Sequence, residues 1–301
     1  MKRILVLGGT GFVGGHLCKE LARLQYRVTV PTRSKAQAVQ SQPLVDLVQA
    51  DIHDKAALAR LIPGHDAVVN LVAILHGDLF RFEYVHVELV KKIARACQDS
   101  GVLRLVHVSA LGAATDAPSM YQRSKAAGEA VLQGSQLDWT VLRPSVIFGE
   151  GDQFLALFAR LQKALPVMPL AGADTLFQPV WVGDVVAAIV QCLQRDDTAK
   201  RTYEVCGPER FTLRQLVKMA GSLSGHARPV IGLPPPIARL QALFMELAPG
   251  PTLMSRDNLD SMKVSNVASG KLPGLDALGI APHALDAIAP TYLGARQSSP
   301  L

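Results

Sequence analysis

The chain has 301 residues and a mass of 32.3 kDa, with 49% hydrophobic, 19% charged and 5% aromatic residues. This composition excludes a disordered chain and a coiled coil, and the length is sufficient for a large core. Thirty-one basic against 25 acidic residues give a formal charge of +6. A stripe of basic residues interleaved with aromatic ones, which would indicate nucleic-acid binding, does not occur.

The first half alternates short apolar, β-branched segments with longer amphipathic ones. Strands are expected at Arg3–Leu7, Arg27–Val30, Val45–Gln49, Ala67–Leu71, Leu103–Ser109 and Thr140–Arg143. Helices are expected at Phe12–Gln25, Lys55–Leu61, Phe82–Ser100 and Tyr121–Gly134. This alternation predicts an α/β protein with a doubly wound parallel sheet covered on both faces, and a ligand at the carboxyl ends of the strands.

The pattern loosens after Pro144, where Pro- and Gly-rich segments separate short elements. We expect residues 1–145, joined by about 174–206, to form a Rossmann domain that receives Thr202–Cys206 as a further strand. Residues 146–173 and 207–295 are expected to form a smaller C-terminal substrate lobe, and 296–301 a frayed tail.

The cysteines and the apolar runs bear on the cellular environment. Cys18, Cys97, Cys192 and Cys206 are scattered, which predicts buried thiols in a reducing compartment and neither a metal site nor a disulfide framework. No apolar run approaches the roughly 18–20 residues of a membrane span, and Ile4–Leu7 is too short for a signal peptide. A cytoplasmic protein is expected.

A glycine-rich turn follows the first expected strand. Residues 8–14 satisfy both G-x-x-G-x-x-G and G-x-G-x-x-G, and a helix is expected directly after them. Glycines here permit a tight turn, let the backbone approach a pyrophosphate, and leave helix N–H groups free for the anion. An ordinary turn could look similar, but the strand–turn–helix context favours a dinucleotide site. Its expected contacts are Gly8, Thr10, Gly11, Phe12 and Val13.

The acidic residue that usually holds the ribose 2′-hydroxyl of NAD(H) is missing from the end of the second expected strand. Thr32 stands there, followed by Arg33. A guanidinium can bind a 2′-phosphate through two hydrogen bonds, so NADP(H) is favoured over NAD(H), the alternative being a solvated loop cation. Asp51 and Ile52, after the third strand, are placed to touch the adenine, and Asp51 could equally cap the next helix.

Tyr121 and Lys125 are spaced to lie one turn apart on the same face of a helix. An ammonium nearby is expected to lower the pKa of the phenol, making Tyr121 an acid–base group, while Lys125 can also hold the nicotinamide ribose. Ser109 ends the fifth expected strand, where it could orient a substrate carbonyl or hydroxyl. Y-x-x-x-K alone is common, so its weight comes from the glycine turn and the serine-ended strand that precede it.

These residues resemble the short-chain dehydrogenase/reductase superfamily in its extended or atypical branch, the NAD-dependent epimerases and dehydratases. The resemblance implies that Ser109, Tyr121 and Lys125 are the catalytic set. It continues through Val69–Ala73, Leu142–Gly149 and Phe177–Val185. The further cofactor contacts that it implies are Leu71, Val72, Ala73 and Pro144.

Softer features resemble the NADPH-holding accessory subunit of respiratory complex I and its bacterial relatives. His86-Val87 stands where sugar-nucleotide epimerases commonly have Asn-Val, and Val108–Ala113, Phe177–Val180 and Ala238–Gln241 add to the likeness. In that subunit the nucleotide is thought to be structural, so an intact Tyr-Lys pair does not establish turnover. The family resemblance also implies a candidate homodimer through the helices that carry His86 and Tyr121.

The second half says little about the substrate. Leu165–Leu170 predicts an apolar wall, which favours a hydrophobic ligand over a sugar. His76 and His86 could reach the cleft, although a lone histidine is more often structural. Basic residues that could grip a sugar nucleotide, but that could equally be surface charges, are Arg201, Arg210, Arg214 and Arg256.

The helix expected at 237–247 follows three prolines. One side of it carries Ile237, Leu240, Leu243, Phe244 and Leu247. We favour a core-facing helix, because such a stripe is the usual packing signature. The alternative is a partly exposed face for a peripheral contact with the inner membrane, a respiratory complex or another large partner.

We therefore expect an NADP(H)-binding oxidoreductase acting on a carbonyl or hydroxyl group of an apolar small molecule. One alternative is a non-catalytic, cofactor-holding subunit or assembly factor of a quinone-linked respiratory complex. A redox sensor that binds NADP(H) without turnover and a nucleotide-sugar epimerase or dehydratase remain open.

Overall fold

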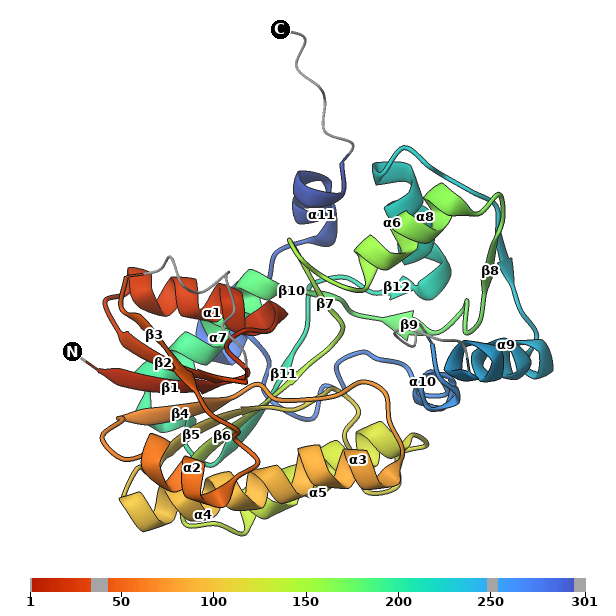
Figure 1. Cartoon of the computed structure of the whole chain (residues 1–301). Coiled ribbons are helices and arrows are strands. Elements are labelled where there is room, and N and C mark those ends of the chain that lie inside the picture. Colours follow the sequence, from red (N-terminus) through yellow and green to blue (C-terminus); the bar gives the residue numbers. More distant parts are fainter. Residues whose placement is uncertain (1, 34–42, 248–253, 295–301) are drawn as a thin grey trace, which may run out of the picture.

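A seven-stranded parallel sheet forms the centre of the larger domain (Figure 1). The computed structural model describes residues 2–33, 43–247 and 254–294. The strands are β1 (Arg3–Leu7), β2 (Arg27–Thr32), β3 (Val45–Gln49), β4 (Ala67–Asn70), β5 (Arg104–Val108), β6 (Asp138–Pro144) and β11 (Arg201–Val205). Their order is β11-β6-β5-β4-β1-β2-β3, and all neighbours pair in parallel. The predicted fold class is confirmed.

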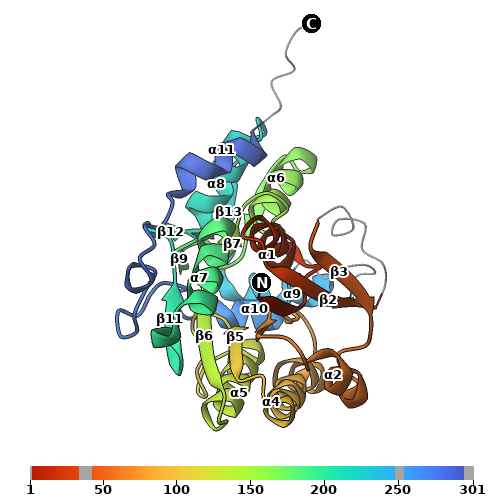
Figure 2. The same ribbon diagram turned by 90° about the vertical axis from the view of Figure 1, so that its left-hand side faces the viewer.

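Helices cover both faces of this sheet, as Figure 2 shows end-on. One face carries α1 (Phe12–Arg23) and α7 (Val182–Gln194), and the other carries α2 (Lys55–Leu61), α4 (Leu89–Ser100) and α5 (Met120–Gln133). Alternate residues of β1 enter two separate cores, because successive side chains of a strand point to opposite faces. Ile4 and Val6 pack with α1 and α7, whereas Leu5 and Leu7 pack with α2 and α4.

The helix expected at Phe82–Ser100 begins earlier and is interrupted. It starts as α3 (Leu79–Glu83), whose first turn is capped by Asp78, and passes through one π-helical turn, η1 (Tyr84–Glu88), before α4. The π turn lies against α5, where a Cβ on Gly128 would stand 2.2 Å from the carbonyl oxygen of His86. The bulge therefore coincides with the closest approach between this helix and α5.

In the described part of the smaller lobe, three helices pack with three two-stranded ribbons around a core of their own. The helices are α6 (Leu155–Ala164), α8 (Leu213–Leu223) and α11 (Leu285–Leu293). The ribbons pair β7 (Ile147–Phe148) with β10 (Val180–Trp181), β8 (Met168–Leu170) with β13 (Val230–Gly232), and β9 (Leu176–Phe177) with β12 (Phe211–Thr212). Two 3₁₀ turns, η2 (Asp196–Thr198) and η3 (Asp276–Leu278), lie beside the main sheet domain.

The expected apolar wall at Leu165–Leu170 largely belongs to the core of the small lobe. Met168 and Leu170 are 4% and 1% exposed and pack with α6, α8 and α11, because β8 pairs with β13 and turns these side chains inward. Leu165 and Val167 remain partly exposed. The prediction that this segment forms an apolar wall for a ligand is therefore wrong for Met168 and Leu170.

The helix expected at 237–247 is α9 (Pro235–Leu247), followed by α10 (Arg256–Ser261). The core-facing interpretation of its stripe is wrong, because the small residues Ala238 and Ala242 make the buried contact. The large apolar side chains of α9 that are more than half exposed are Ile237, Leu240, Phe244 and Leu247.

Two further expectations concern the whole chain. All four cysteines are free and buried, as expected, and burial raises the pKa of each thiol to about 12. Among the helices of the described residues, none is long and apolar enough to cross a membrane. The expected tail at 296–301 lies outside the described residues.

Candidate functional site

The glycine turn stands at the carboxyl end of β1, at the point where the strand order of the sheet reverses. Gly8 has a φ of +83°, and Gly11 donates its N–H to the Gly8 carbonyl at 3.0 Å. A Cβ on Gly14 would lie 2.3 Å from that carbonyl oxygen, so only glycine lets α1 begin so close to the strand. Gly11 provides no side chain to cap the first N–H groups of α1, and Phe12–Gly15 contain no acidic residue. The positive end of the helix is therefore available to an anion.

The segment after β4 lies against this turn. A Cβ on Gly8 would lie 3.3 Å from Leu71 and from the backbone nitrogen of Val72. Buried Asn70 fixes the segment: its Oδ1 accepts from Val72 N–H at 3.1 Å, and its amide nitrogen donates to His107 Nδ1 at 3.1 Å. The structure thus brings two of the three expected cofactor-binding stretches together, Gly8–Val13 and Leu71–Ala73.

The third stretch is formed by the ends of β2 and β3, where the backbone N–H of Ala50 donates to Thr32 O at 3.1 Å. Arg33 is exposed there and lies near enough to His53 to lower its pKa. Burial is the larger cause of that lowering, while Asp51 raises the pKa. Exposed basic charge therefore borders the position expected for the adenosine.

Asp51 does not cap the helix that follows it. Its Oδ1 accepts from His53 N–H at 2.9 Å within a local turn, whereas Asp54 caps α2 by accepting from Ala56 N–H at 2.9 Å. The capping alternative for Asp51 is therefore wrong. Asp51 and Ile52 sit in the loop after β3, at the same edge of the sheet as the glycine turn.

Lys125 is buried in α5, and its Nζ donates to Val108 O at the end of β5 at 2.9 Å. Burial lowers its pKa to about 8, against an opposing effect of Glu129. Tyr121 is partly exposed as a whole residue, but desolvation of its phenol raises its pKa to about 12. The expected lowering of the Tyr121 pKa is therefore wrong, because burial of the phenol raises it instead.

Ser109 does not present its hydroxyl to Tyr121. The hydroxyl donates to Glu129, which lies two helical turns beyond Tyr121 in α5. Glu129 also forms a bidentate ion pair with Arg143 of β6, whose Nη2 lies 2.5 Å from Glu129 Oε2. Nearby, Pro144 is buried at the end of β6 and its carbonyl accepts from Leu111 N–H at 2.9 Å. Ser109 thus belongs to a buried polar cluster that joins β5, α5 and β6.

His86 connects the segment after β4 to α5. Its Nε2 accepts from Ile74 N–H at 3.1 Å, and its Nδ1 lies 2.8 Å from Ser124 Oγ, which donates to Tyr121 O at 2.8 Å. Burial, assisted by the charge of Lys125, lowers the pKa of His86 to about 3. The neutral ring therefore carries its proton on Nδ1. A structural role was expected for His86, but the sequence gives no signal for these partners, which are 12 and 38 positions away.

One contributor from the small lobe was missed. Asp257 of α10 accepts hydrogen bonds from the backbone nitrogens of Met120 and Tyr121, where α5 begins. Its separation of more than 130 residues from these partners left no sequence signal. Within the described residues, no cluster of three or more His, Cys, Asp or Glu could hold a metal ion.

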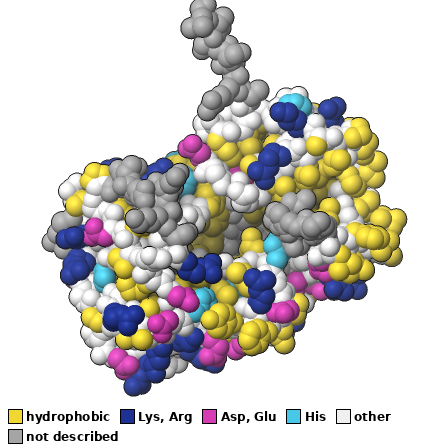
Figure 3. All heavy atoms as spheres, in the orientation of Figure 1, with side chains coloured by type: hydrophobic (Ala, Val, Ile, Leu, Met, Phe, Trp, Pro, Cys, Tyr) yellow, Lys and Arg dark blue, Asp and Glu magenta, His cyan; other side chains and the backbone are white. Residues whose placement is uncertain are grey.

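The site therefore combines backbone at the end of β1 and after β4 with a few buried titratable groups of α5. A glycine turn, the Leu71–Ala73 segment and the Tyr121–Lys125 face of α5 border the same carboxyl edge of the sheet. In the view of Figure 3 the surface is hollowed between the two parts of the molecule. Such an arrangement can hold a dinucleotide along the sheet edge, with its reactive end toward α5.

Comparisons with known proteins agree with this geometry. The chain is 32% identical over 290 residues to the mitochondrial NADH dehydrogenase (ubiquinone) 1 alpha subcomplex subunit 9 of Mus musculus, covering 93% of this chain and 77% of the relative. It is 27% identical over 236 residues to a ceramide reductase of Caulobacter vibrioides, covering 77% of this chain and 74% of the relative.

Solved structures share the fold. The dTDP-glucose 4,6-dehydratase DesIV of Streptomyces venezuelae, solved with NAD bound, superposes with a TM-score of 0.76 at 22% identity, covering 97% of this chain and 95% of the dehydratase. The sequence pattern of the NAD dependent epimerase/dehydratase family matches residues 4–206, which include the glycine turn, Tyr121 and Lys125. This chain belongs to the NAD dependent epimerase/dehydratase family.

Proposed function

We propose that the protein binds NADP(H) and transfers hydride between the nicotinamide and a carbonyl or hydroxyl carbon of an apolar small molecule. The observation that carries the proposal is the buried Lys125 beside Tyr121, held by Val108 O at the sheet edge where the glycine turn stands. The bound cofactor supplies the hydride, and the protein supplies position and a proton.

Tyr121 is the proton donor to the carbonyl oxygen, since a phenol with a pKa near 12 keeps its proton at neutral pH. Lys125, with a pKa of about 8, is largely an ammonium at neutral pH and holds ribose hydroxyls. Ser109 acts through Glu129, because its hydroxyl is already donated there, and so supports α5 rather than polarising the substrate. These roles are part of the proposal.

The preference for NADP(H) rests on Arg33. It is exposed beyond β2, where an acidic residue would repel a 2′-phosphate, and its charge reaches the loop that carries Asp51 and His53. The nature of the substrate is supported by exposed apolar side chains in the segment after β4 and at the start of α3, namely Leu75, Leu79 and Phe80. The relative described as a ceramide reductase acts on a lipid, which agrees with an apolar substrate.

The test is nucleotide binding followed by a screen of carbonyl substrates. Tyr121→Phe removes the proton donor and should lower turnover by roughly 10²- to 10⁴-fold while leaving NADPH binding nearly intact. Arg33→Asp should weaken NADPH binding roughly 10- to 100-fold and NADH binding much less. Equal losses for both nucleotides would refute the cofactor preference, and unchanged turnover in Tyr121→Phe would refute the catalytic role.

A second candidate is a cofactor-holding subunit that docks peripherally on a membrane-associated respiratory complex. It is favoured by the exposed face of α9, where Phe244 and Leu247 are 65% and 74% exposed. Figure 3 shows hydrophobic side chains along the right-hand edge, where α9 lies in Figure 1. Arg239 of α9 and the neighbouring Arg256 and Lys263 are more exposed than their acidic partners, and this basic charge around the apolar face suits an anionic bilayer.

Vesicles distinguish this candidate. Replacing Leu240 and Phe244 by Ser should abolish sedimentation with vesicles of phosphatidylcholine and phosphatidylglycerol, and pure phosphatidylcholine should bind the wild type less. The control replaces Leu79 and Phe80 by Ser, since these are even more exposed than Leu240 and Phe244 but lie on the other domain. Tight NADPH binding with vesicle binding and no turnover would favour the subunit over the enzyme.

A further inference from the structure

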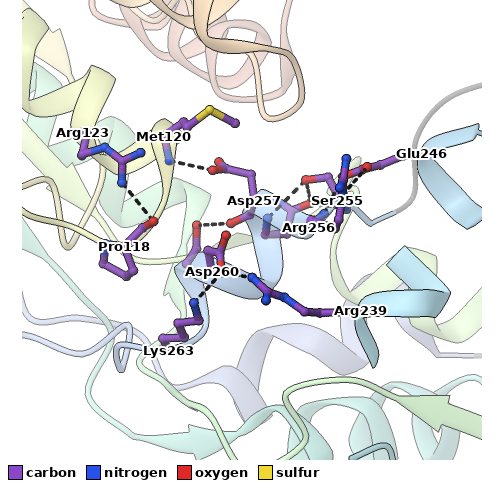
Figure 4. Close-up of polar contacts among 12 residues, drawn as sticks. Pro118, Met120, Arg123, Arg239, Glu246, Ser255, Arg256, Asp257, Asp260 and Lys263 are labelled. Atoms are coloured by element: carbon purple, nitrogen blue, oxygen red, sulfur yellow. Dashed lines mark hydrogen bonds and ion pairs between the residues drawn. The ribbon is translucent and has the colours of Figure 1, made fainter. Parts of the chain in front are cut away.

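The helix that carries Tyr121 is held at its first turn by the small lobe. Asp257 accepts from Met120 N–H at 2.6 Å and from Tyr121 N–H at 3.0 Å, one through each carboxylate oxygen (Figure 4). Ser119 accepts from the next N–H, that of Gln122, at 3.1 Å. Asp257 is 7% exposed, so its charge interacts with the positive end of α5 largely out of water.

The position of Asp257 is itself fixed from the side of α9. Glu246 of α9 accepts from the backbone nitrogen of Arg256 at 2.6 Å and from its Nε at 2.8 Å. One turn later, Asp260 pairs with Arg239 of α9 at 3.3 Å and with Lys263 at 2.7 Å. In Figure 4 these contacts run continuously from Glu246 and Arg239 through α10 to Met120.

Tyr121 and Lys125 are held by different partners. Lys125 is anchored on the main sheet, because its Nζ donates to Val108 O at 2.9 Å. Tyr121 lies in the first turn of α5, where its own backbone N–H is bound to Asp257. The small lobe therefore contacts the tyrosine end of this pair directly, whereas the glycine turn lies apart, at the end of β1.

We propose that Asp257 is a positioning residue for the nicotinamide end of the site, setting the place of the Tyr121 phenol from the small lobe. The proposal rests on the proposed dinucleotide function. It predicts that Asp257 matters for the half of the cofactor near Tyr121 and not for the half at Arg33 and the glycine turn.

The test compares NADPH with adenosine 2′,5′-bisphosphate, which lacks the nicotinamide half, in titrations of the full chain. Asp257→Ala should weaken NADPH binding roughly tenfold, the effect of about one displaced hydrogen bond, while the fragment binds nearly as before. Asp257→Asn keeps one acceptor and should lose less than Asp257→Ala. The control is Asp174→Asn, which removes a carboxylate of the small lobe that pairs with Arg214 at 3.6 Å rather than with α9 or α10, and it should leave both affinities nearly unchanged.

Three results would overturn the proposal. NADPH binding unchanged in Asp257→Ala would show that α10 does not position Tyr121. Equal losses of NADPH and fragment would show a general disruption, as would an effect of Asp174→Asn as large as that of Asp257→Ala. If the wild type binds neither nucleotide, the proposed function itself fails, and this result is distinct from wild-type binding that is insensitive to Asp257.

Discussion

At the level of single side chains, His86 determines how the segment after β4 is held against α5. Its neutral ring accepts from Ile74 and donates to Ser124, and a second proton on Nε2 would face the Ile74 N–H. The site therefore depends on a histidine whose ring must remain neutral, and its pKa of about 3 in the folded chain meets this requirement.

This pKa predicts a pH dependence of stability. Unfolded histidine titrates near pH 6.5, so between about pH 6.5 and 3 the unfolded chain binds a proton that folded His86 does not. His86 therefore makes the free energy of unfolding fall as the pH drops through this window, by up to about 1.4 kcal/mol per pH unit. Urea unfolding at pH 6, 5 and 4 should show a shallower loss for His86→Gln, whose amide keeps one acceptor and one donor. Parallel losses in the two proteins would contradict the assignment, since buried His107 is common to both.

A second residue-scale prediction concerns Glu129. It is buried, accepts from Ser109 and pairs with Arg143, so removing its charge leaves a guanidinium in β6 without its partner. Glu129→Gln should lower the free energy of unfolding by about 3 kcal/mol, as for a broken buried ion pair. Ser109→Ala removes only one hydrogen bond and should cost about 1 kcal/mol. Chemical denaturation measures both, and a larger cost for Ser109→Ala would contradict this ranking.

At the level of elements, the contact between the π turn η1 and α5 depends on Gly128. Its missing side chain admits the His86 carbonyl, and a Cβ would lie 2.2 Å from that oxygen. Gly128→Ala should therefore push the two helices apart and destabilise the fold by about 1–3 kcal/mol, despite the better helix propensity of alanine. Gly134→Ala at the end of α5 is the control, since its Cβ would meet nothing nearer than 3.5 Å. Thermal unfolding should separate the two variants, and equal midpoints would show that the contact yields without cost.

Some helices and strands could be predicted from the sequence, and others could not. The sheet strands and the helices α1 and α2 were predictable because a buried parallel sheet requires long apolar segments in regular alternation with helices. The ribbons of the small lobe have only two or three paired residues each, too few for any periodicity to appear. The stripe on α9 was visible, but a stripe of this kind is the same whether it faces a core or the exterior.

The candidate site divides in the same way. Residues 8–14, Tyr121 and Lys125 lie within short motifs whose chemistry is local, so their placement at one sheet edge could be predicted. The orientation of Ser109 toward Glu129 could not, because it depends on Arg143 reaching the same carboxylate from the next strand. Asp257 was beyond sequence reasoning altogether, since its partners are brought to it only by the packing of one lobe on the other.

On the scale of the whole molecule, the exposed face of α9 and the Tyr121 helix are joined through α10, so the two proposed contacts should be linked. If Asp257 transmits position, a ligand at either end changes affinity at the other by the same factor. Vesicles of phosphatidylcholine and phosphatidylglycerol should then tighten NADPH binding by about fivefold or more, and NADPH should strengthen sedimentation equally. Asp257→Ala should keep vesicle binding, because α9 is untouched, yet lose this mutual effect. Vesicle binding by the wild type with no change in NADPH affinity would mean that α9 and Tyr121 are fixed independently, each by its own lobe.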